Sequence, residues 1–230
     1  MKKGKIIVIE GTDCSGKATQ TEKLIARLKA DGKKVFQFGF PQYNSPTGKI
    51  VGGPYLGKDY ICEGWFPEKA PNVDALTSIC YYAADRRYHR QTILDHLAQD
   101  EIVILDRYTI SNMAHQGGKL KTRDEKIKMF KKIAMLEFDI LELPEPDIVF
   151  ILYMPQDYAY KLKETRNTYE HLDQLESSYD HLKSAEETYM LLSELYGYEK
   201  INCIKDKEVR TIEDIHEELY QKTIKVIEEK

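Results

Sequence analysis

An α/β fold, with a parallel sheet covered by helices on both faces, is predicted by two patterns in the sequence. Short apolar runs without polar alternation recur along the chain, which is typical of strands buried on both faces. Segments with the apolar spacing of amphipathic helices separate these runs, as the crossovers of a parallel sheet require. The chain of 230 residues is long enough for one sizeable core. We therefore expect three layers, with a sheet of about five strands between helices, in a single domain over residues 1–230.

The predicted elements alternate in chain order. Strands are expected at residues 5–10, 35–38, 102–106, 148–154 and 201–204, where short apolar runs occur. Helices are expected at residues 19–30, near 74–97, near 124–143 and at 212–227. The first helix carries Leu24, Ile25 and Leu28 on one face, and the third carries Phe130, Ala134 and Phe138 at i+4 spacing. Residues 39–71 are rich in Gly, Pro and Tyr, so we expect an irregular surface segment there.

The composition is that of an ordinary globular protein, with 42% hydrophobic and 31% charged residues. The net charge of −4 gives no general attraction to nucleic acid or to an anionic membrane. The sequence contains no apolar run long enough to span a bilayer, and its four cysteines form no CxxC pair. We therefore expect a reduced, cytoplasmic protein without nucleic-acid or membrane partners, in which local clusters provide any anion binding.

Residues 11–20 (GTDCSGKATQ) nearly match a phosphate-binding loop. Gly11, Gly16 and Lys17 fit the pattern, but Ala18 replaces the Ser or Thr whose hydroxyl contacts magnesium. The stretch follows a predicted strand and opens a predicted helix, whose free N–H groups and dipole can hold an anion. The alternative is a chance Gly-rich turn. We expect a nucleotide-phosphate site made of Gly11, Thr12, Asp13, Cys14, Ser15, Gly16, Lys17, Ala18 and Thr19.

A second polar group follows the strand at residues 102–106. Asp106 ends this strand at its C-terminal edge, where parallel sheets bind ligands, and an Asp there commonly holds a metal-bound water. Arg107 is suited to clamping a second phosphate. The alternative is that Asp106 caps a helix while Arg107 pairs with a surface acid. Further polar candidates follow on the next turn or helix, namely Ser111, Asn112, His115 and Gln116.

Five stretches, in the same order and spacing, resemble the thymidylate kinase family, and the resemblance covers nearly the whole chain. They are the loop at 11–20, FPQYNSPTGK at 40–49, YYAADR at 81–86, DRYTISNMAHQG at 106–117 and LPEPDIVFIL at 143–152. The resemblance implies a P-loop kinase fold, usually dimeric. It also implies ATP and Mg²⁺ as cofactors and transfer of the γ-phosphoryl group of ATP to thymidine 5′-monophosphate (dTMP).

The resemblance further implies roles for single residues. Lys17 and the loop amides would hold the ATP phosphates, and Arg107 would bind the acceptor phosphate. Asp106 would orient a magnesium-bound water, and Asp13 would contact the 3′-hydroxyl region of the acceptor. The acceptor site would be lined by Phe40, by Tyr82 stacked on thymine, by Arg86 at the base edge, by Ser111, Asn112 and Gln116, and by His115 beside the sugar.

Several positions depart from the family pattern. Ala18 lacks the magnesium-binding hydroxyl, His115 stands where the family usually has Tyr or Phe, and Tyr43 replaces an arginine of some members. Cys14 lacks the positive charge that one branch places in the loop. The family's other solution is a basic lid, which we expect near residues 161–176 with Arg166 as its catalytic cation and Lys161 and Lys163 as substitutes. The alternative for this segment is a solvated, charged helix end.

Two other functions remain open from the sequence. A related nucleoside or nucleotide kinase with another acceptor would share the loop and Arg107 but need different base contacts. A non-catalytic nucleotide sensor would bind ATP without turnover, and Ala18 is its main support. A signalling GTPase is disfavoured because the sequence has no NKxD-type guanine reader.

Overall fold

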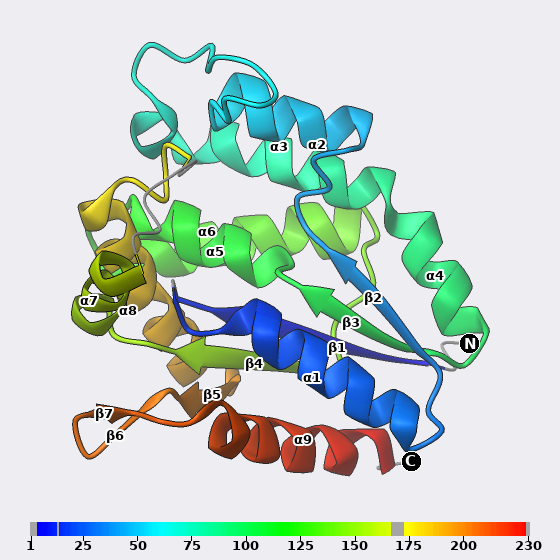
Figure 1. Cartoon of the computed structure of the whole chain (residues 1–230). Coiled ribbons are helices and arrows are strands. Elements are labelled where there is room, and N and C mark those ends of the chain that lie inside the picture. Colours follow the sequence, from blue (N-terminus) through cyan, green and yellow to red (C-terminus); the bar gives the residue numbers. More distant parts are fainter. Residues whose placement is uncertain (1–3, 13, 167–172, 229–230) are drawn as a thin grey trace.

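The structure, a computed structural model, describes residues 4–12, 14–166 and 173–228, without the side chains of residues 163–166. One parallel sheet of five strands forms its centre, in the order β2-β3-β1-β4-β5 (Figure 1). The strands are β1 (Lys5–Gly11), β2 (Val35–Gly39), β3 (Ile102–Asp106), β4 (Ile148–Tyr153) and β5 (Glu199–Asn202). The predicted α/β fold class is confirmed, and the last strand begins two residues before the predicted position.

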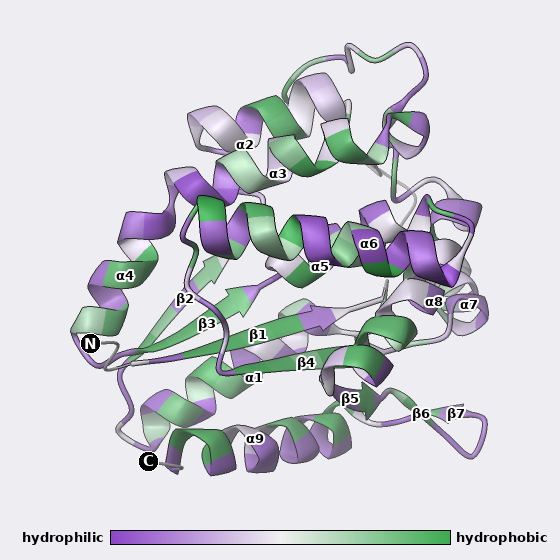
Figure 2. Cartoon of the chain, turned by 180° about the vertical axis from the view of Figure 1, so that it is seen from behind, coloured by the Kyte–Doolittle hydropathy of each residue, from purple (hydrophilic) through white to green (hydrophobic). Residues whose placement is uncertain are grey.

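Helices cover both faces of the sheet (Figures 1 and 2). One face packs against α1 (Lys17–Ala30), α7 (Gln156–Arg166) and α9 (Ile212–Glu228). The other packs against α3 (Ala75–Tyr88), α4 (Arg90–Ala98), α5 (Thr109–Gly118), α6 (Arg123–Ala134) and α8 (Tyr179–Tyr196). Within β1, Ile6 and Val8 pack in the core on the α5 side of the sheet, whereas Ile7 and Ile9 pack in the core on the α1 side. Successive side chains of a strand point to opposite faces of the sheet, and helices cover both faces. Both faces of β1 are therefore apolar.

Two predicted helices differ from the structure. The helix expected near 74–97 is a pair, α3 and α4, that meets at His89, whose φ and ψ of −96° and 3° are not helical. The His89 ring packs against Phe38 and Phe40 at the end of β2, so a tertiary contact fixes the break. The helix expected near 124–143 is α6 followed by a π-helical segment, η3 (Met135–Ile140).

The segment at 39–71 is only partly irregular. It contains the short helix α2 (Pro46–Ile50), a π-helical turn η1 (Val51–Tyr55) and a 3₁₀ turn η2 (Ala70–Asn72). Its apolar residues Val51, Tyr55, Leu56 and Ala70 form a third core together with Val73 and Leu175. The sequence composition predicted the loops of this segment but not its small core.

Three elements near the C-terminus were not predicted. These are α7, α8 and a hairpin formed by β6 (Ile204–Lys205) and β7 (Glu208–Val209). Helix α8 packs along α5 and carries buried residues at helical spacing, including Leu182, Tyr189 and Leu192. That spacing was a usable signal for a helix. None of the helices in the described ranges combines the length and apolar character that a membrane crossing requires.

Candidate active site

The phosphate loop connects β1 to α1 at the C-terminal edge of the sheet. A Cβ atom on Gly11 would lie 2.5 Å from the Leu152 carbonyl oxygen, so this position has room only for glycine. Gly16 has a φ of 79° and caps α1, a conformation that glycine adopts without strain. Thr12 Oγ1 donates to the Met154 carbonyl oxygen at 2.6 Å and accepts from Met154 N at 2.9 Å. The loop is therefore held against the end of β4.

The first turn of α1 faces this loop and carries no acidic residue. Lys17 is its first residue, and its Nζ donates to the carbonyl oxygens of Gly11 at 3.1 Å and Thr12 at 3.4 Å. Ser15 is buried, whereas Ala18 and Thr19 are exposed on the same turn. A lysine and a free helix N-terminus therefore point to the same place, which favours an anion. Cys14 is half-buried, and Asp13 lies outside the described residues.

Asp106 ends β3 beside the loop, paired in register with Ile9 of β1. Its Oδ1 atom is enclosed and has no hydrogen-bond partner among the described residues. A buried carboxylate oxygen without a partner is a costly arrangement that a cation or a cation-bound water would satisfy. The alternative role as a helix cap does not hold, because α5 begins after Tyr108 and shows no side-chain cap.

Glu10 fixes the segment after Asp106, a role that the sequence analysis missed. Its Oε1 accepts from the backbone N–H groups of Tyr108 at 2.8 Å and Ser111 at 3.0 Å. Its Oε2 accepts from Ser111 Oγ at 2.5 Å and from the Tyr189 hydroxyl at 2.8 Å. Burial raises the pKa of Glu10, while Arg107 and these hydrogen bonds oppose the rise. A charged residue at the end of an otherwise apolar strand was the available signal.

Arg107 follows with a φ of 64°, which turns the chain away from the sheet. Its Nη1 donates to Ser111 Oγ at 3.4 Å. The side chain lines two hollows, a small one beside Gly11 and Thr12 and a larger cavity. His115 also lines both. Arg107 therefore lies between the phosphate loop and the cavity.

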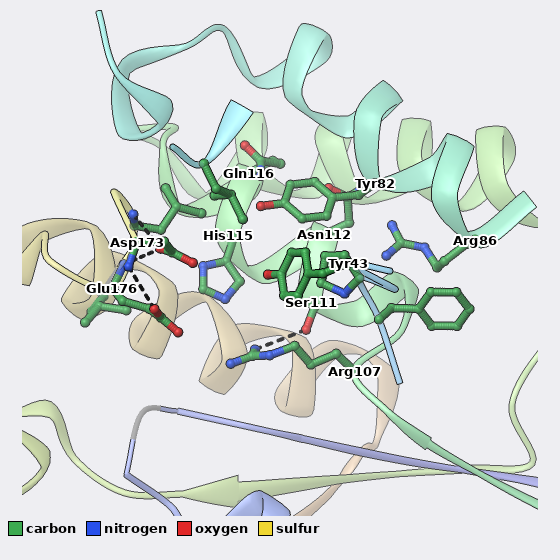
Figure 3. A pocket seen from close by; sticks show the side chains of 15 residues that line it. Tyr43, Tyr82, Arg86, Arg107, Ser111, Asn112, His115, Gln116, Asp173 and Glu176 are labelled. Atoms are coloured by element: carbon green, nitrogen blue, oxygen red, sulfur yellow. Dashed lines mark hydrogen bonds between the residues drawn. The ribbon is translucent and has the colours of Figure 1, made fainter. Parts of the chain in front are cut away.

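The larger cavity, called the acceptor cavity below, gathers side chains from α3, α5, the segment after β2 and the chain at 173–182 (Figure 3). Eight residues singled out in the sequence line it, namely Phe40, Tyr82, Arg86, Arg107, Ser111, Asn112, His115 and Gln116. The structure therefore brings together residues that are 76 positions apart in the sequence, from Phe40 to Gln116. Tyr43, noted in the sequence as a departure from the family pattern, also lines it, as do Asp173, Leu175 and Glu176 from the predicted lid. The lining residues without an individual prediction are Pro41, Leu56 and Leu182.

Asp85 holds the segment after β2 in place. This buried carboxylate accepts from the backbone N–H of Gln42 at 2.9 Å and from the Thr47 hydroxyl at 2.7 Å. Both groups belong to the stretch that brings Phe40 and Tyr43 to the cavity wall. Phe40 itself is buried, with its ring 5.2 Å from that of Phe38.

Arg86 is 2% exposed and is paired with a carboxylate that the sequence analysis did not single out. Its Nε and Nη2 donate to the two oxygens of Glu137, at 2.5 and 2.7 Å. Burial alone lowers the pKa of Arg86, but the Glu137 charge outweighs this effect and keeps the pKa above its ordinary value. Glu137 lies seven residues after Phe130, on the buried stripe of the helix, and a glutamate on an apolar stripe was a usable signal.

His115 pairs with a second histidine on α8. Its Nδ1 lies 3.0 Å from His181 Nε2, and the two rings stack with centroids 5.3 Å apart. Burial and the neighbouring His181 lower the pKa of His115 well below the ordinary histidine value. His115 therefore stays neutral at pH 7, and the pair joins α5 to the start of α8.

The far wall of the cavity is the segment 173–176, directly after residues 167–172, which lie outside the described residues. Lys58 Nζ lies 3.0 Å from Asp173 Oδ2 and 3.7 Å from Glu176 Oε2. It also lies 5.0 Å from the centre of the Tyr43 ring. No motif predicts this cluster, because Lys58 and Asp173 are far apart in the sequence.

Part of the predicted lid falls beyond what the structure describes. Helix α7 ends at Arg166, and Lys161 is exposed on it. The side chains of Lys163 and Arg166 lie outside the described residues, as do residues 167–172. The remainder of the lid, residues 173–176, forms the cavity wall just described.

Comparisons with known proteins agree with this geometry. A family model described as thymidylate kinase matches residues 9–219. The chain is 32% identical over 222 residues to a thymidylate kinase of Prochlorococcus marinus, covering 94% of this chain and 96% of that one. It is 30% identical over 214 residues to a probable thymidylate kinase of Methanocaldococcus jannaschii, covering 93% and 92% of the two chains. A solved thymidylate kinase from Candida albicans superposes with a TM-score of 0.72 at 22% identity, covering 98% of this chain and 94% of that chain.

Proposed function

The chain belongs to the thymidylate kinase family of ATP-dependent nucleoside monophosphate kinases, and on this premise we propose how its site transfers the γ-phosphoryl group from ATP to dTMP. The phosphate loop binds the ATP phosphates, and the acceptor cavity binds dTMP. The observation that carries the proposal is the position of Arg107, which lines both the hollow beside the loop and the acceptor cavity.

Phosphoryl transfer needs little covalent assistance from a protein, so alignment of two anions and neutralisation of charge account for most of the catalysis. Lys17, with the loop amides and the N-terminus of α1, binds the donor phosphates. Arg107, held through Ser111, binds the acceptor phosphate from the other side. Glu10 fixes Ser111 and with it the geometry of Arg107.

The acceptor cavity offers what a nucleoside with a flat base requires. Tyr82 supplies an aromatic wall, and Arg86 and Asn112 supply a donor and an acceptor of hydrogen bonds. Phe40 adds an apolar aromatic side chain to the lining. Ser111 and Gln116 also line the cavity, and His115 lines both the cavity and the hollow beside the phosphate loop.

Magnesium fits the donor set of this site. When bound with ATP, it neutralises charge on the phosphate oxygens. With Ala18 in place of a hydroxyl residue, we assign its protein contact to Asp106 through a bound water, and the unpartnered Oδ1 atom supports this assignment. Residues 161–176 act as the lid, and Arg166 supplies a cation to the transferring phosphoryl group. Its helix ends at Arg166, and the chain next described, from Asp173, forms a wall of the acceptor cavity.

The remaining proposals concern the whole chain. Residues 1–230 form a single kinase domain, supported by two large cores that pack against the two faces of one sheet. We assign it to the cytoplasm, because its four cysteines are free thiols. A homodimer is supported by an apolar hollow on the outer face of α2 and α3, lined by Ile50, Cys80, Tyr81 and Ala84. We expect Cys80→Arg to shift the protein from dimer to monomer in analytical ultracentrifugation.

A panel of acceptors with ATP tests the proposed reaction. We expect ADP release to be fastest with dTMP, weaker with dUMP, and poor with purine monophosphates, because Tyr82, Arg86 and Asn112 on the cavity wall suit a thymine-sized base. Faster turnover of a purine acceptor would overturn the assignment of dTMP. ATP binding without ADP release for any acceptor would favour the nucleotide sensor instead.

A further inference from the structure

Glu137 contacts Arg86 and Asn112, two polar residues that line the acceptor cavity, without lining the cavity itself. It is fully buried in η3, and its oxygens accept four hydrogen bonds. Arg86 provides two of them, Thr109 Oγ1 a third at 2.7 Å and Asn112 Nδ2 the fourth at 2.9 Å. A carboxylate can only accept hydrogen bonds, so each neighbour must turn a donor toward it.

This arrangement fixes the side-chain amide of Asn112. Its Nδ2 donates to Glu137 Oε1 and also to the Ile79 carbonyl oxygen at 3.2 Å, so both amide hydrogens face acceptors inside the protein. The opposite atom, Oδ1, is buried and has no hydrogen-bond partner among the described residues. Because Asn112 lines the acceptor cavity, Oδ1 is the atom available to a ligand, and it can only accept.

The same carboxylate orients Arg86. Nε and Nη2 pair with Glu137 in a two-pronged contact, and Nη1 is the nitrogen that takes no part in it. Arg86 also lines the cavity, and a guanidinium can only donate. The acceptor cavity therefore presents an acceptor from Asn112 and a donor from Arg86, and Glu137, together with the Ile79 carbonyl oxygen, sets the polarity of Asn112.

We propose that Glu137 is a positioning residue that selects the imide edge of thymine and uracil over the amidine edge of cytosine. The inference rests on the proposed function, since it concerns the base of the acceptor nucleotide. An imide edge offers N3–H to Asn112 and the O4 oxygen to Arg86. A cytosine edge offers an acceptor at N3 and a donor at N4. Its N3 would face the accepting oxygen of Asn112, and its N4 amino group would face the donating guanidinium of Arg86. Unpaired buried polar groups then disfavour its binding.

The decisive pair of acceptors is dTMP and 5-methyl-dCMP, which share the ring, the methyl group and the phosphate but have opposite hydrogen-bonding edges. In the unchanged protein, we expect kcat/KM for dTMP to exceed that for 5-methyl-dCMP by at least about a thousandfold. If 5-methyl-dCMP were used within about tenfold of dTMP, the polarity of the pocket would not be fixed and the proposal would be wrong. This arm needs no variant.

Glu137→Gln tests the residue itself. When the new amide N–H faces Asn112 Nδ2, two donors oppose each other. Rotation of the Asn112 amide relieves this by turning Oδ1 toward residue 137 and Nδ2 toward the cavity. We expect the ratio of kcat/KM values to fall by at least about a hundredfold and KM for dTMP to rise, with KM for ATP unchanged. Glu137→Asp keeps an accepting carboxylate and should retain a discrimination close to that of the unchanged protein.

A control separates specificity from general loss of stability. Asp147→Asn makes the same chemical change at a carboxylate that accepts from Ile6 N at 2.7 Å, far from the cavity lining. We expect it to lower stability and leave the ratio unchanged. If Glu137→Gln lowered both activities equally and kept the ratio, Glu137 would be structural only. If the unchanged protein used neither acceptor, the proposed function itself would fail.

Discussion

The phosphate loop and the acceptor cavity adjoin each other at one edge of the sheet, yet they are built in opposite ways. The loop is contiguous, and we expect it to bind an anion mainly through backbone groups and Lys17. The cavity collects side chains from Phe40 to Leu182, and these depend on partners outside it, such as Glu137 and Lys58. A local motif therefore forms the proposed donor site, whereas tertiary contacts form the cavity proposed for the acceptor.

The largest expected effect is at the loop. Lys17→Ala removes the charge that faces the donor phosphates, and we expect kcat to fall by at least about a thousandfold, roughly 4 kcal/mol. Because the acceptor cavity is built separately, KM for dTMP should change little. Steady-state kinetics with both substrates varied checks this. A large rise in KM for dTMP would contradict the separation of the two sites.

The next effect concerns the lid. Arg166→Ala should lower kcat by at least about a hundredfold while changing KM for dTMP little, because the contact matters mainly in the transition state. Lys163→Ala is the matched control and should retain most activity, since lysine lacks the planar fork of arginine. If kcat fell in Lys163→Ala but stayed normal in Arg166→Ala, the catalytic cation would be Lys163. Normal turnover in both variants would leave this segment a solvated helix end.

A smaller pair of effects tests the metal assignment. Ala18→Ser restores the missing hydroxyl, and we expect kcat to change by less than about tenfold, roughly 1.4 kcal/mol, because other groups hold the metal. Asp106→Asn should reduce kcat more, and added Mg²⁺ should restore part of the loss. Rescue of an inactive protein by Ala18→Ser, by a thousandfold, would instead show a decayed loop.

The smallest effect is a pH dependence of stability within the cavity wall. Burial and His181, with Arg107 nearby, lower the pKa of His115, so the folded state resists protonation there. The unfolded chain binds this proton near pH 6.5, and stability from His115 is therefore present above that pH and lost as the pH falls below it. Urea unfolding between about pH 7 and pH 5 should show a steeper loss in the unchanged protein than in His115→Phe. Equal slopes would contradict this account.

The sequence predicted the sheet and the loop well for a physical reason. Strands such as β3 are apolar on both faces, and the loop has a fixed spacing of Gly11, Gly16 and Lys17. Periodicity could not reveal the break at His89, because an aromatic contact with β2 causes it. The composition of residues 39–71 indicated loops, but the third core exists only where these residues meet Leu175.

Prediction of the candidate site was limited in the same way. The residues carried over from the family resemblance converge on one cavity, including Tyr82, Arg86 and Asn112. Their supporting carboxylates were missed, since Glu10 and Glu137 act across the fold on partners far away in the sequence. The only signal was a charged residue at a position where the pattern is apolar. Such a residue indicates a buried charged group, but the sequence does not show which residues it contacts.

Calorimetric titration of dTMP without ATP shows whether the acceptor binds in the cavity and independently of the loop. We expect the unchanged protein and Lys17→Ala to bind dTMP with affinities within about threefold of each other. We expect at least about tenfold weaker binding to Arg86→Ala, whose ATP affinity stays normal and shows that the protein is folded. Loss of dTMP binding in Lys17→Ala together with normal binding in Arg86→Ala would place the acceptor at the loop and contradict the account.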